Sequence, residues 1–264
     1  MCQKGPFYSL RLLAAGARLA HNLPVRIFLF AIVLAAAPVQ ARDTVAIDVG
    51  HFLGEPGAIS ARGRPELEFN RELALEIDSA VLGKGLGSFL IGFDGLMSRL
   101  SARAVAGANA DFLLSVHHDS VQPHFLQVWE YEGIPRLFSD RYAGFSLFVS
   151  RKSAYVGPSL VCASAIGAAM RRAGFSPSLY HADRIPGEFK PFADKANGVH
   201  YYDNLIVLKR ARTPAVLLEA GVIINRDEEL EMQRENVHRR IAEAVADGLH
   251  RCLPGRRART STPE

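Results

Sequence analysis

From Asp43 onward, short apolar runs of strand length alternate along the chain with longer stretches of helical periodicity. Residues 44–49 (TVAIDV) form the first run. In residues 67–82, apolar side chains recur every four positions, which places them on one face of a helix. They are Phe69, Leu73, Ile77 and Val81. This alternation of strand and helix predicts an α/β domain.

The same pattern predicts the remaining elements of the domain. Further strands are expected at residues 88–93, 111–116, 127–131, 144–149, 205–208 and 215–218. Further helices are expected at residues 98–110, 160–173 and 230–250. Residues 174–204 are expected to lack regular structure. Together the elements predict one domain with a mostly parallel or mixed twisted sheet of about six strands and helices on both faces.

The first 41 residues have a different character. They carry Lys4, Arg11, Arg18 and Arg26 but no acidic residue, followed by an apolar run at residues 27–37 and the sequence VQA. This order is typical of a secretory signal peptide cleaved after residue 41. The apolar run is too short to span a bilayer comfortably. We therefore predict a periplasmic or secreted protein that is free of the membrane once the signal is removed.

Charge changes the picture once the signal is set aside. The chain has a formal net charge of +4, and the four basic residues of the signal account for all of it. No concentrated basic face remains, which argues against nucleic acid as a partner. Residues 42–253 are expected to form one folded domain, as a monomer. Residues 254–264, with arginines in a Ser/Thr/Pro setting, are expected to form a disordered tail.

Two cysteines remain after signal removal, Cys162 and Cys252. In an oxidising compartment they could form a disulfide, and the alternative is two buried thiols on helices. The pattern leaves both open. Neither cysteine belongs to a Cys-x-x-Cys pair, which argues against a redox motif or an all-thiolate zinc site.

Four residues suited to metal chemistry are expected to share one edge of the sheet. His51, His117 and Glu219 each follow directly on a predicted apolar strand, and Glu66 begins the first predicted helix. In open α/β sheets, ligands bind beyond the carboxyl ends of the strands. The four side chains can therefore converge although they lie far apart in the sequence.

The residue types fit a hydrolytic zinc site. Such sites take three protein ligands from His and carboxylate side chains and keep a further position for water. His51, Glu66 and His117 supply this set. A further carboxylate is needed to take a proton from the water and hand it to the leaving nitrogen, and Glu219 is the candidate for this catalytic role.

The stretches that carry these residues resemble the amidase-3 family of zinc-dependent N-acetylmuramoyl-L-alanine amidases. The resemblance covers nearly all of the chain after the signal. Its motifs are VAIDVGH at residues 45–51, ELEFN at 66–70, ADFLLSVHHDS at 110–120 and PAVLLEAGVIINRDEE at 214–229.

The resemblance implies one zinc ion per chain, bound by His51, Glu66 and His117, with Glu219 as the catalytic residue. It also implies peptidoglycan as the substrate, cut at the amide between the lactyl group of N-acetylmuramic acid and L-alanine. The role would be cell-wall remodelling or daughter-cell separation. An activator protein is left open as a second partner.

Neighbouring residues compete for two of the assignments. Glu68 lies close to Glu66, and His118 directly follows His117. Alternation of side-chain direction favours Glu66 and His117. Phe52 and Leu53 stand where the family often has two glycines, which puts the shape of the first loop in doubt. Arg99 and Arg103 both lie near the arginine that precedes the second histidine in the family, and neither receives a role.

Residues 174–204 are expected to border the substrate groove, with Glu188 or His181 reaching towards the metal. A surface loop with solvated charges is the plainer alternative. Two other functions stay open at this point. One is an exported zinc peptidase or deacetylase that acts on another substrate, and the other is an inactive wall-binding regulatory module.

Overall fold

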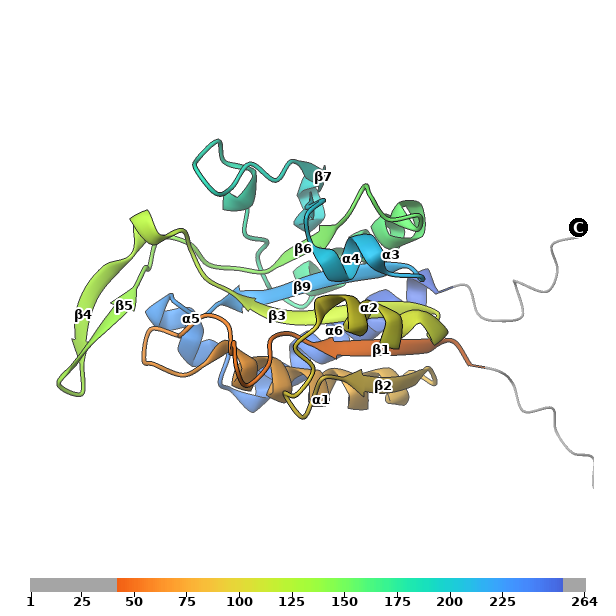
Figure 1. Ribbon diagram of the computed structural model, residues 1–264, viewed down its shortest axis with the longest axis horizontal. Coiled ribbons are helices and arrows are strands. Elements are labelled where there is room, and N and C mark those ends of the chain that lie inside the picture. The colour runs from red at the N-terminus through yellow and green to blue at the C-terminus, as the bar shows by residue number, and fades with distance from the viewer. Residues whose placement is uncertain (1–41, 254–264) are drawn as a thin grey trace, which may run out of the picture. The chain divides into compact units, whose positions relative to one another are not determined.

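A seven-stranded sheet runs through the computed structural model, which describes residues 42–253 (Figure 1). The strands lie in the order β2-β1-β3-β9-β6-β8-β7. Their bounds are β1 (Thr44–Val49), β2 (Gly87–Ile91), β3 (Phe112–Asp119), β6 (Ser146–Val149), β7 (Phe192–Asp194), β8 (Val199–Tyr201) and β9 (Ala215–Val222). The predicted signal peptide at residues 1–41 and the predicted tail at residues 254–264 lie outside the described residues.

The direction of the strands fixes which ends meet at one edge. Strands β2, β1, β3 and β9 run parallel to one another, whereas β6 runs antiparallel to β9. Strand β8 is parallel to β6, and β7 is antiparallel to β8. The predicted mixed, mostly parallel sheet is confirmed, with seven strands where about six were expected. The carboxyl ends of β1, β3 and β9 therefore share one edge, where α/β folds place their ligands.

Helices cover both faces of the sheet, as predicted. The first face carries α1 (Glu66–Gly83), α3 (Val156–Arg172) and α6 (Glu235–Cys252), and the second carries α2 (Leu100–Ala106) and α4 (Ile206–Arg210). Strand alternation sends Ile47 and Leu114 into the larger core under the first set. Ala46 and Leu113 enter the smaller core under the second. Because both faces are covered, the central strands read as nearly continuous apolar runs.

The prediction of a strand at residues 205–208 is wrong. These residues begin α4, with Val207 and Leu208 buried against the second face of the sheet. A run of four apolar residues does not distinguish one turn of buried helix from a short buried strand.

The predicted closing helix at residues 230–250 is broken in two. Helix α5 (Arg226–Glu231) begins at Asn225, whose side chain accepts hydrogen bonds from the backbone amides of Asp227 and Glu228. Asn225 is thus a helix N-cap. The chain leaves the helical conformation at Arg234, which precedes α6 and has extended backbone angles. This break lets α6 turn and pack against α1 and α3.

The expectation that residues 174–204 lack regular structure is also wrong in part. They contain two short 3-10 helices, at Tyr180–Ala182 and Lys195–Asn197, and the strands β7 and β8, of which β7 is an edge strand of the sheet. Three-residue strands are too short for an alternating pattern to become visible in sequence. The Asp194 side chain accepts from the amide of Asn197 and holds the turn between the two strands.

The predicted strand at residues 127–131 exists but does not join the main sheet. It is β4 (Gln127–Tyr131), and it pairs only with β5 (Ile134–Phe138), which the sequence reading missed. This hairpin projects away from the main sheet at the left of Figure 1. Trp129 packs on Tyr131 and donates its indole N–H to the carbonyl of Ala61, 3.0 Å away, so it both packs the hairpin and ties it to the loop before α1.

Cys162 in α3 and Cys252 at the end of α6 form a disulfide. The bond joins the two helices that pack together on the first face of the sheet. Of the two alternatives that the sequence left open, the disulfide is therefore correct and the pair of free buried thiols is not. Across residues 42–253, no helix has both the length and the apolar character needed to cross a membrane.

Candidate metal centre

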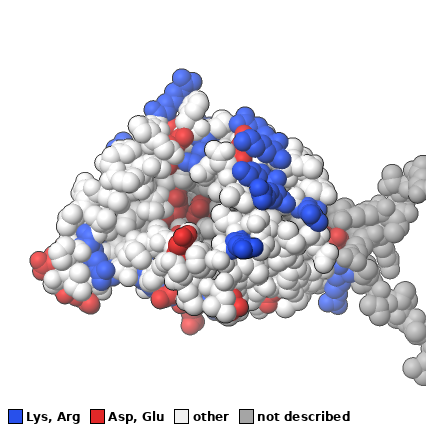
Figure 2. All heavy atoms as spheres, viewed as in Figure 1, with Lys and Arg blue, Asp and Glu red and all other residues white. Residues whose placement is uncertain are grey.

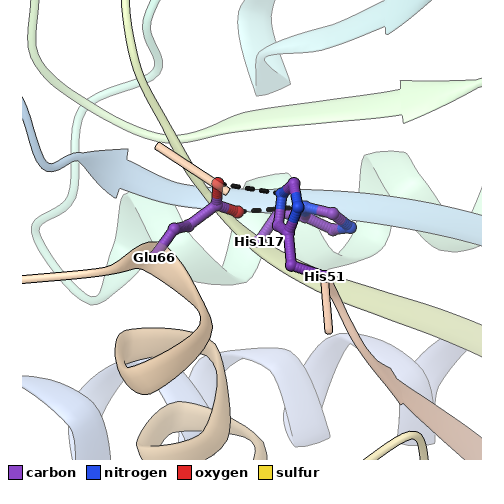
Figure 3. Close-up of side chains that lie close together, drawn as sticks. All are labelled: His51, Glu66 and His117. Carbon is purple, nitrogen blue, oxygen red and sulfur yellow. Dashed lines mark hydrogen bonds and ion pairs between the residues drawn. The ribbon is translucent and has the colours of Figure 1, made fainter. Parts of the chain in front are cut away.

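Three of the four predicted site residues meet at the shared carboxyl edge of the sheet. His51 directly follows Gly50 at the end of β1, His117 lies near the end of β3, and Glu66 is the first residue of α1. One ligand atom from each residue lies within 4.8 Å of the other two. Figure 3 shows the two imidazole rings turned towards the Glu66 carboxylate.

The Glu66 carboxylate bridges the two imidazoles. His51 Nε2 lies 2.9 Å from Glu66 Oε2, and His117 Nδ1 lies 3.1 Å from Glu66 Oε1. The two rings meet edge to face, with their centroids 4.9 Å apart. Two nitrogen donors and one carboxylate therefore point at a common place.

Further donors fix the Glu66 carboxylate. The Asn70 side chain and the backbone amide of His118 donate to Oε1, and the backbone amide of Ala58 donates to Oε2. Burial raises the pKa of Glu66, but the hydrogen bonds from His117 and His51 outweigh burial and hold it far below its usual range. Glu66 is thus a fixed negative charge, which favours a cation beside it.

His51 responds to the same carboxylate. Burial lowers the pKa of His51, but its hydrogen bond to Glu66 and the negative charge there outweigh burial and raise it. Histidine binds a metal ion through its neutral ring. A cation bound between His51 and Glu66 would therefore take the place of the imidazole proton that Glu66 now attracts.

Two glycines keep space around the cluster. A Cβ on Gly50 would lie 2.4 Å from His117 ring atoms, and one on Gly57 would lie 2.4 Å from Glu66 Oε2. Any other residue there would displace the ligand side chains. The donor set and the space around it therefore fit one metal ion held by two histidines and a carboxylate.

The competing neighbours lie elsewhere. Glu68 is exposed and pairs with Arg64 at 2.8 Å, on the outside of α1. His118 is buried on the opposite side of β3, where its Nδ1 lies 2.8 Å from Asn70 Oδ1. The alternation of side-chain direction along helix and strand thus separates Glu66 from Glu68 and His117 from His118.

Glu219 lies on β9 directly across from His117. Neighbouring residues in register on parallel strands send their side chains to the same face of the sheet, so Glu219 faces the cluster's side. Its Oε2 is shielded from solvent and has no hydrogen-bond partner among the described residues. Burial raises the pKa of Glu219 well above its usual range, and the charges of Asp119 and Glu66 raise it further. A buried carboxyl without a partner is costly, which makes Glu219 a candidate functional residue.

Acidic side chains are prominent on this face. Figure 2 shows Asp and Glu side chains in a hollow near its centre, surrounded mostly by uncharged side chains. The hollow thus leaves some acidic side chains open to solvent.

Neither His181 nor Glu188 joins the metal cluster. His181 lies between two carboxylates, with Nε2 2.8 Å from Asp119 and Nδ1 2.9 Å from Glu188. The Gln122 side chain also donates to Glu188. The hypothesis that one of the two reaches the metal is therefore not supported, because both are held in ion pairs that tie the segment to the end of β3.

The structure also gives a role to a residue that the sequence left without one. Arg103 of α2 is fully buried and pairs with Asp48 of β1 directly beneath the first loop of the site. Most of its other bonds go to backbone carbonyls, and backbone partners leave no signature in sequence. Arg99, the other arginine in question, is only the residue that precedes α2.

An α/β sheet with two histidines and a carboxylate gathered at its parallel strand ends is the arrangement of the class of mononuclear metal-dependent hydrolases. Comparison with known proteins gives the particular family. Residues 45–251 match the amidase-3 family, described as N-acetylmuramoyl-L-alanine amidase, and the chain belongs to that family. It is therefore a peptidoglycan amidase, which selects among the functions that the sequence left open.

Solved structures of such amidases share the fold. An N-acetylmuramoyl-L-alanine amidase from Clostridium difficile 630 is 21% identical, with a TM-score of 0.61 over 79% of this chain and 95% of that one. The catalytic domain of CwlV from Bacillus (Paenibacillus) polymyxa var. colistinus is 25% identical, with a TM-score of 0.59 over 81% and 99%. The apo form of Ami1 from Mycobacterium abscessus is 20% identical, with a TM-score of 0.62 over 81% and 100%. No curated protein matched the chain.

Proposed function

We propose that His51, Glu66 and His117 bind one zinc ion and that Glu219 is the catalytic acid and base of the amidase. The observation that carries the proposal is the approach of the three ligand atoms to within 4.8 Å of one another at the strand ends. Two imidazoles and one carboxylate are the donor set of many hydrolytic zinc sites.

A zinc ion bound there supplies Lewis-acid chemistry, which polarises the amide carbonyl and activates water at neutral pH. The work of the protein side chains follows from their positions. His51, Glu66 and His117 fix the place of attack at the carboxyl edge of the sheet. Glu219 lies on the neighbouring strand, where it can take the proton of the attacking water.

Glu219 then gives the proton to the leaving nitrogen of L-alanine, and the bond between the lactyl carbonyl and that nitrogen breaks. The raised pKa suits the second half of this task, in which the carboxyl holds the proton until the nitrogen needs it. A cation bound beside Glu66 would favour the ionised form of Glu219 that the first half requires. The products are a stem peptide with a free amino terminus and an intact glycan strand.

The disulfide between Cys162 and Cys252 supports an oxidising compartment outside the cytoplasm, the place of a cell-wall enzyme. We further propose that the signal at residues 1–41 directs the protein to the periplasm or to secretion. There it acts as a monomer on peptidoglycan in cell-wall remodelling or daughter-cell separation. Residues 174–204 border the substrate groove in this proposal, and an activator protein stays open as a second partner.

The test combines metal analysis with product identification. Purified protein is expected to contain one zinc ion per chain and to release stem peptides from isolated peptidoglycan, leaving glycan strands uncut, as mass spectrometry would detect. Cleavage within the stem peptide, or loss of acetyl groups alone, would contradict the proposed bond. Absence of zinc from a protein with full activity would contradict the proposed metal.

A further inference from the structure

A buried arginine lies directly beneath the candidate metal centre. The Arg103 side chain comes from α2 and is among the largest fully buried side chains of the described residues, at 1% exposure. Its Nη1 lies 2.7 Å from Asp48 Oδ1. Asp48 is equally buried and accepts a second bond from Ser115 at 2.8 Å. The charge of Arg103 is therefore balanced within the core.

Other bonds of Arg103 reach the chain that carries the first ligand. Nη1 donates to the carbonyl of Val49 at 2.5 Å, and Nη2 donates to the carbonyl of His51 itself. Nε and Nη2 also donate to the carbonyl of Met97 in the loop before α2. One guanidinium thus holds the end of β1, the ligand residue and a neighbouring loop together.

His51 needs such support because of its backbone conformation. Its φ is +69°, in the left-handed region that residues other than glycine seldom adopt. A residue is kept in this region only when its surroundings determine the conformation. Arg103 binds the carbonyl groups on either side of Gly50, at Val49 and His51, and so fixes the turn that aims the His51 ring at Glu66.

A glycine leaves room for the guanidinium. A Cβ on Gly92 would lie 2.7 Å from Arg103 Nη1 and 3.1 Å from its Cζ. The loop after β2 is thus shaped around the arginine. The position of Arg103 can therefore be disturbed without changing Arg103 itself.

We propose that Arg103 is a positioning residue for the metal centre, which holds His51 in the left-handed conformation required for metal binding. The inference rests on the proposed zinc site. It predicts that disturbing Arg103 weakens zinc binding in a protein that remains folded. Groups that orient metal ligands typically change metal affinity by about 10- to 100-fold when they are removed.

The first test is Arg103→Lys. Lysine keeps the positive charge beside Asp48 but lacks the planar guanidinium group, whose several N–H donors reach the backbone carbonyls. Zinc affinity is measured by chelator competition, and the visible spectrum of the Co²⁺-substituted protein reports ligand geometry. We expect zinc to bind at least about tenfold more weakly, with a changed Co²⁺ spectrum. Ile241→Ala, in the core of α6, controls for lost stability and should keep both properties.

The second test remains useful if Arg103→Lys does not fold. Gly92→Ala pushes on the guanidinium, whereas Gly85→Ala introduces the same kind of strained positive φ with no atom within 4 Å of the new Cβ. Gly92→Ala is expected to weaken zinc binding and Gly85→Ala to leave it unchanged. Folded Arg103→Lys or Gly92→Ala protein with wild-type zinc affinity and Co²⁺ spectrum would overturn the inference. If the wild type itself binds no zinc, the proposed function fails instead.

Discussion

At the scale of the residue, the site depends on which of two neighbours turns inward. Glu66 and Glu68 are two positions apart on α1, yet Glu66 is buried between two histidines and Glu68 is exposed beside Arg64. The sequence alone favoured Glu66 through alternation but did not exclude Glu68. The structure adds what alternation could not, namely the amides and the Asn70 side chain that orient the Glu66 carboxylate.

The pair Glu66→Gln and Glu68→Gln tests this choice. Gln at position 66 removes the negative charge that the cluster offers to a cation, so we expect zinc content to fall well below one per chain. Gln at position 68 removes only an exposed ion pair, worth about 0.5 kcal/mol, and should leave zinc content unchanged. Metal analysis of both purified proteins gives the answer, and the reverse pattern would assign Glu68 as the ligand.

The role of Arg103 could not be predicted from the sequence. Its position near the second histidine motif suggested no role, because its partners are mostly backbone carbonyls and the carboxylate of Asp48, far away in sequence. Strand alternation, by contrast, correctly turned His117 and His118 to opposite faces. The alternation of residues in a strand thus predicts which way each side chain points. It does not predict which backbone carbonyls need a hydrogen-bond donor.

At the scale of the element, apolar runs predicted every strand that carries the site and missed three strands that do not. Strand β1 was predicted with its observed bounds, because both faces of this central strand are buried. Strands β7 and β8 were missed because each has only three residues, and β5 was missed because it belongs to a separate, mostly exposed hairpin. The segment at residues 174–204 accordingly looked irregular.

Ion pairs hold this segment to the sheet and should make stability depend on pH. Burial raises the pKa of Glu188, but hydrogen bonds from His181, Lys190 and Gln122 outweigh burial and lower it from 4.5 to about 2. A lowered carboxyl pKa stabilises the fold above pH 4.5, and this stabilisation is lost as the pH falls towards 2. The full shift corresponds to about 3 kcal/mol, and because solvent screens this partly exposed group, the ionised Glu188 should contribute on the order of 2 kcal/mol near neutral pH.

Glu188→Gln tests this contribution by urea unfolding at several pH values. We expect the variant to be less stable than the wild type at pH 6 and the difference to shrink steadily below pH 4.5. Asp183→Asn changes an exposed carboxylate in the same segment and should show a much smaller effect. If the stability difference between Glu188→Gln and wild type stays constant down to pH 3, the ionised form of Glu188 does not stabilise the fold as proposed.

At the scale of the whole molecule, the helical layer on the first face is closed by a covalent bond. The Cys162–Cys252 disulfide spans a sequence separation of 90 residues and joins α3 to the end of α6. Sequence could name both cysteines but not their pairing, because their distance depends on how two separately predicted helices pack. A disulfide that closes a long loop stabilises mainly by restricting the unfolded chain.

Replacing both cysteines by serine should therefore lower the free energy of unfolding by about 2–4 kcal/mol. The metal centre lies at the strand ends, away from the bond, so zinc content should not change. Urea unfolding and metal analysis measure the two quantities, and wild-type protein treated with a reductant is the control. Equal stability of oxidised and serine-substituted protein would show that the bond contributes nothing.

The central claim is that one zinc site and one carboxylate perform the amide hydrolysis, and Glu219→Gln tests it most directly. The measurement is zinc content together with the rate of stem-peptide release from isolated peptidoglycan, on the same purified protein. We predict one zinc per chain and a rate lower by about 10²- to 10⁴-fold, the usual loss when an acid–base group is removed. A folded, zinc-loaded Glu219→Gln protein that releases stem peptides at nearly the wild-type rate would contradict the account.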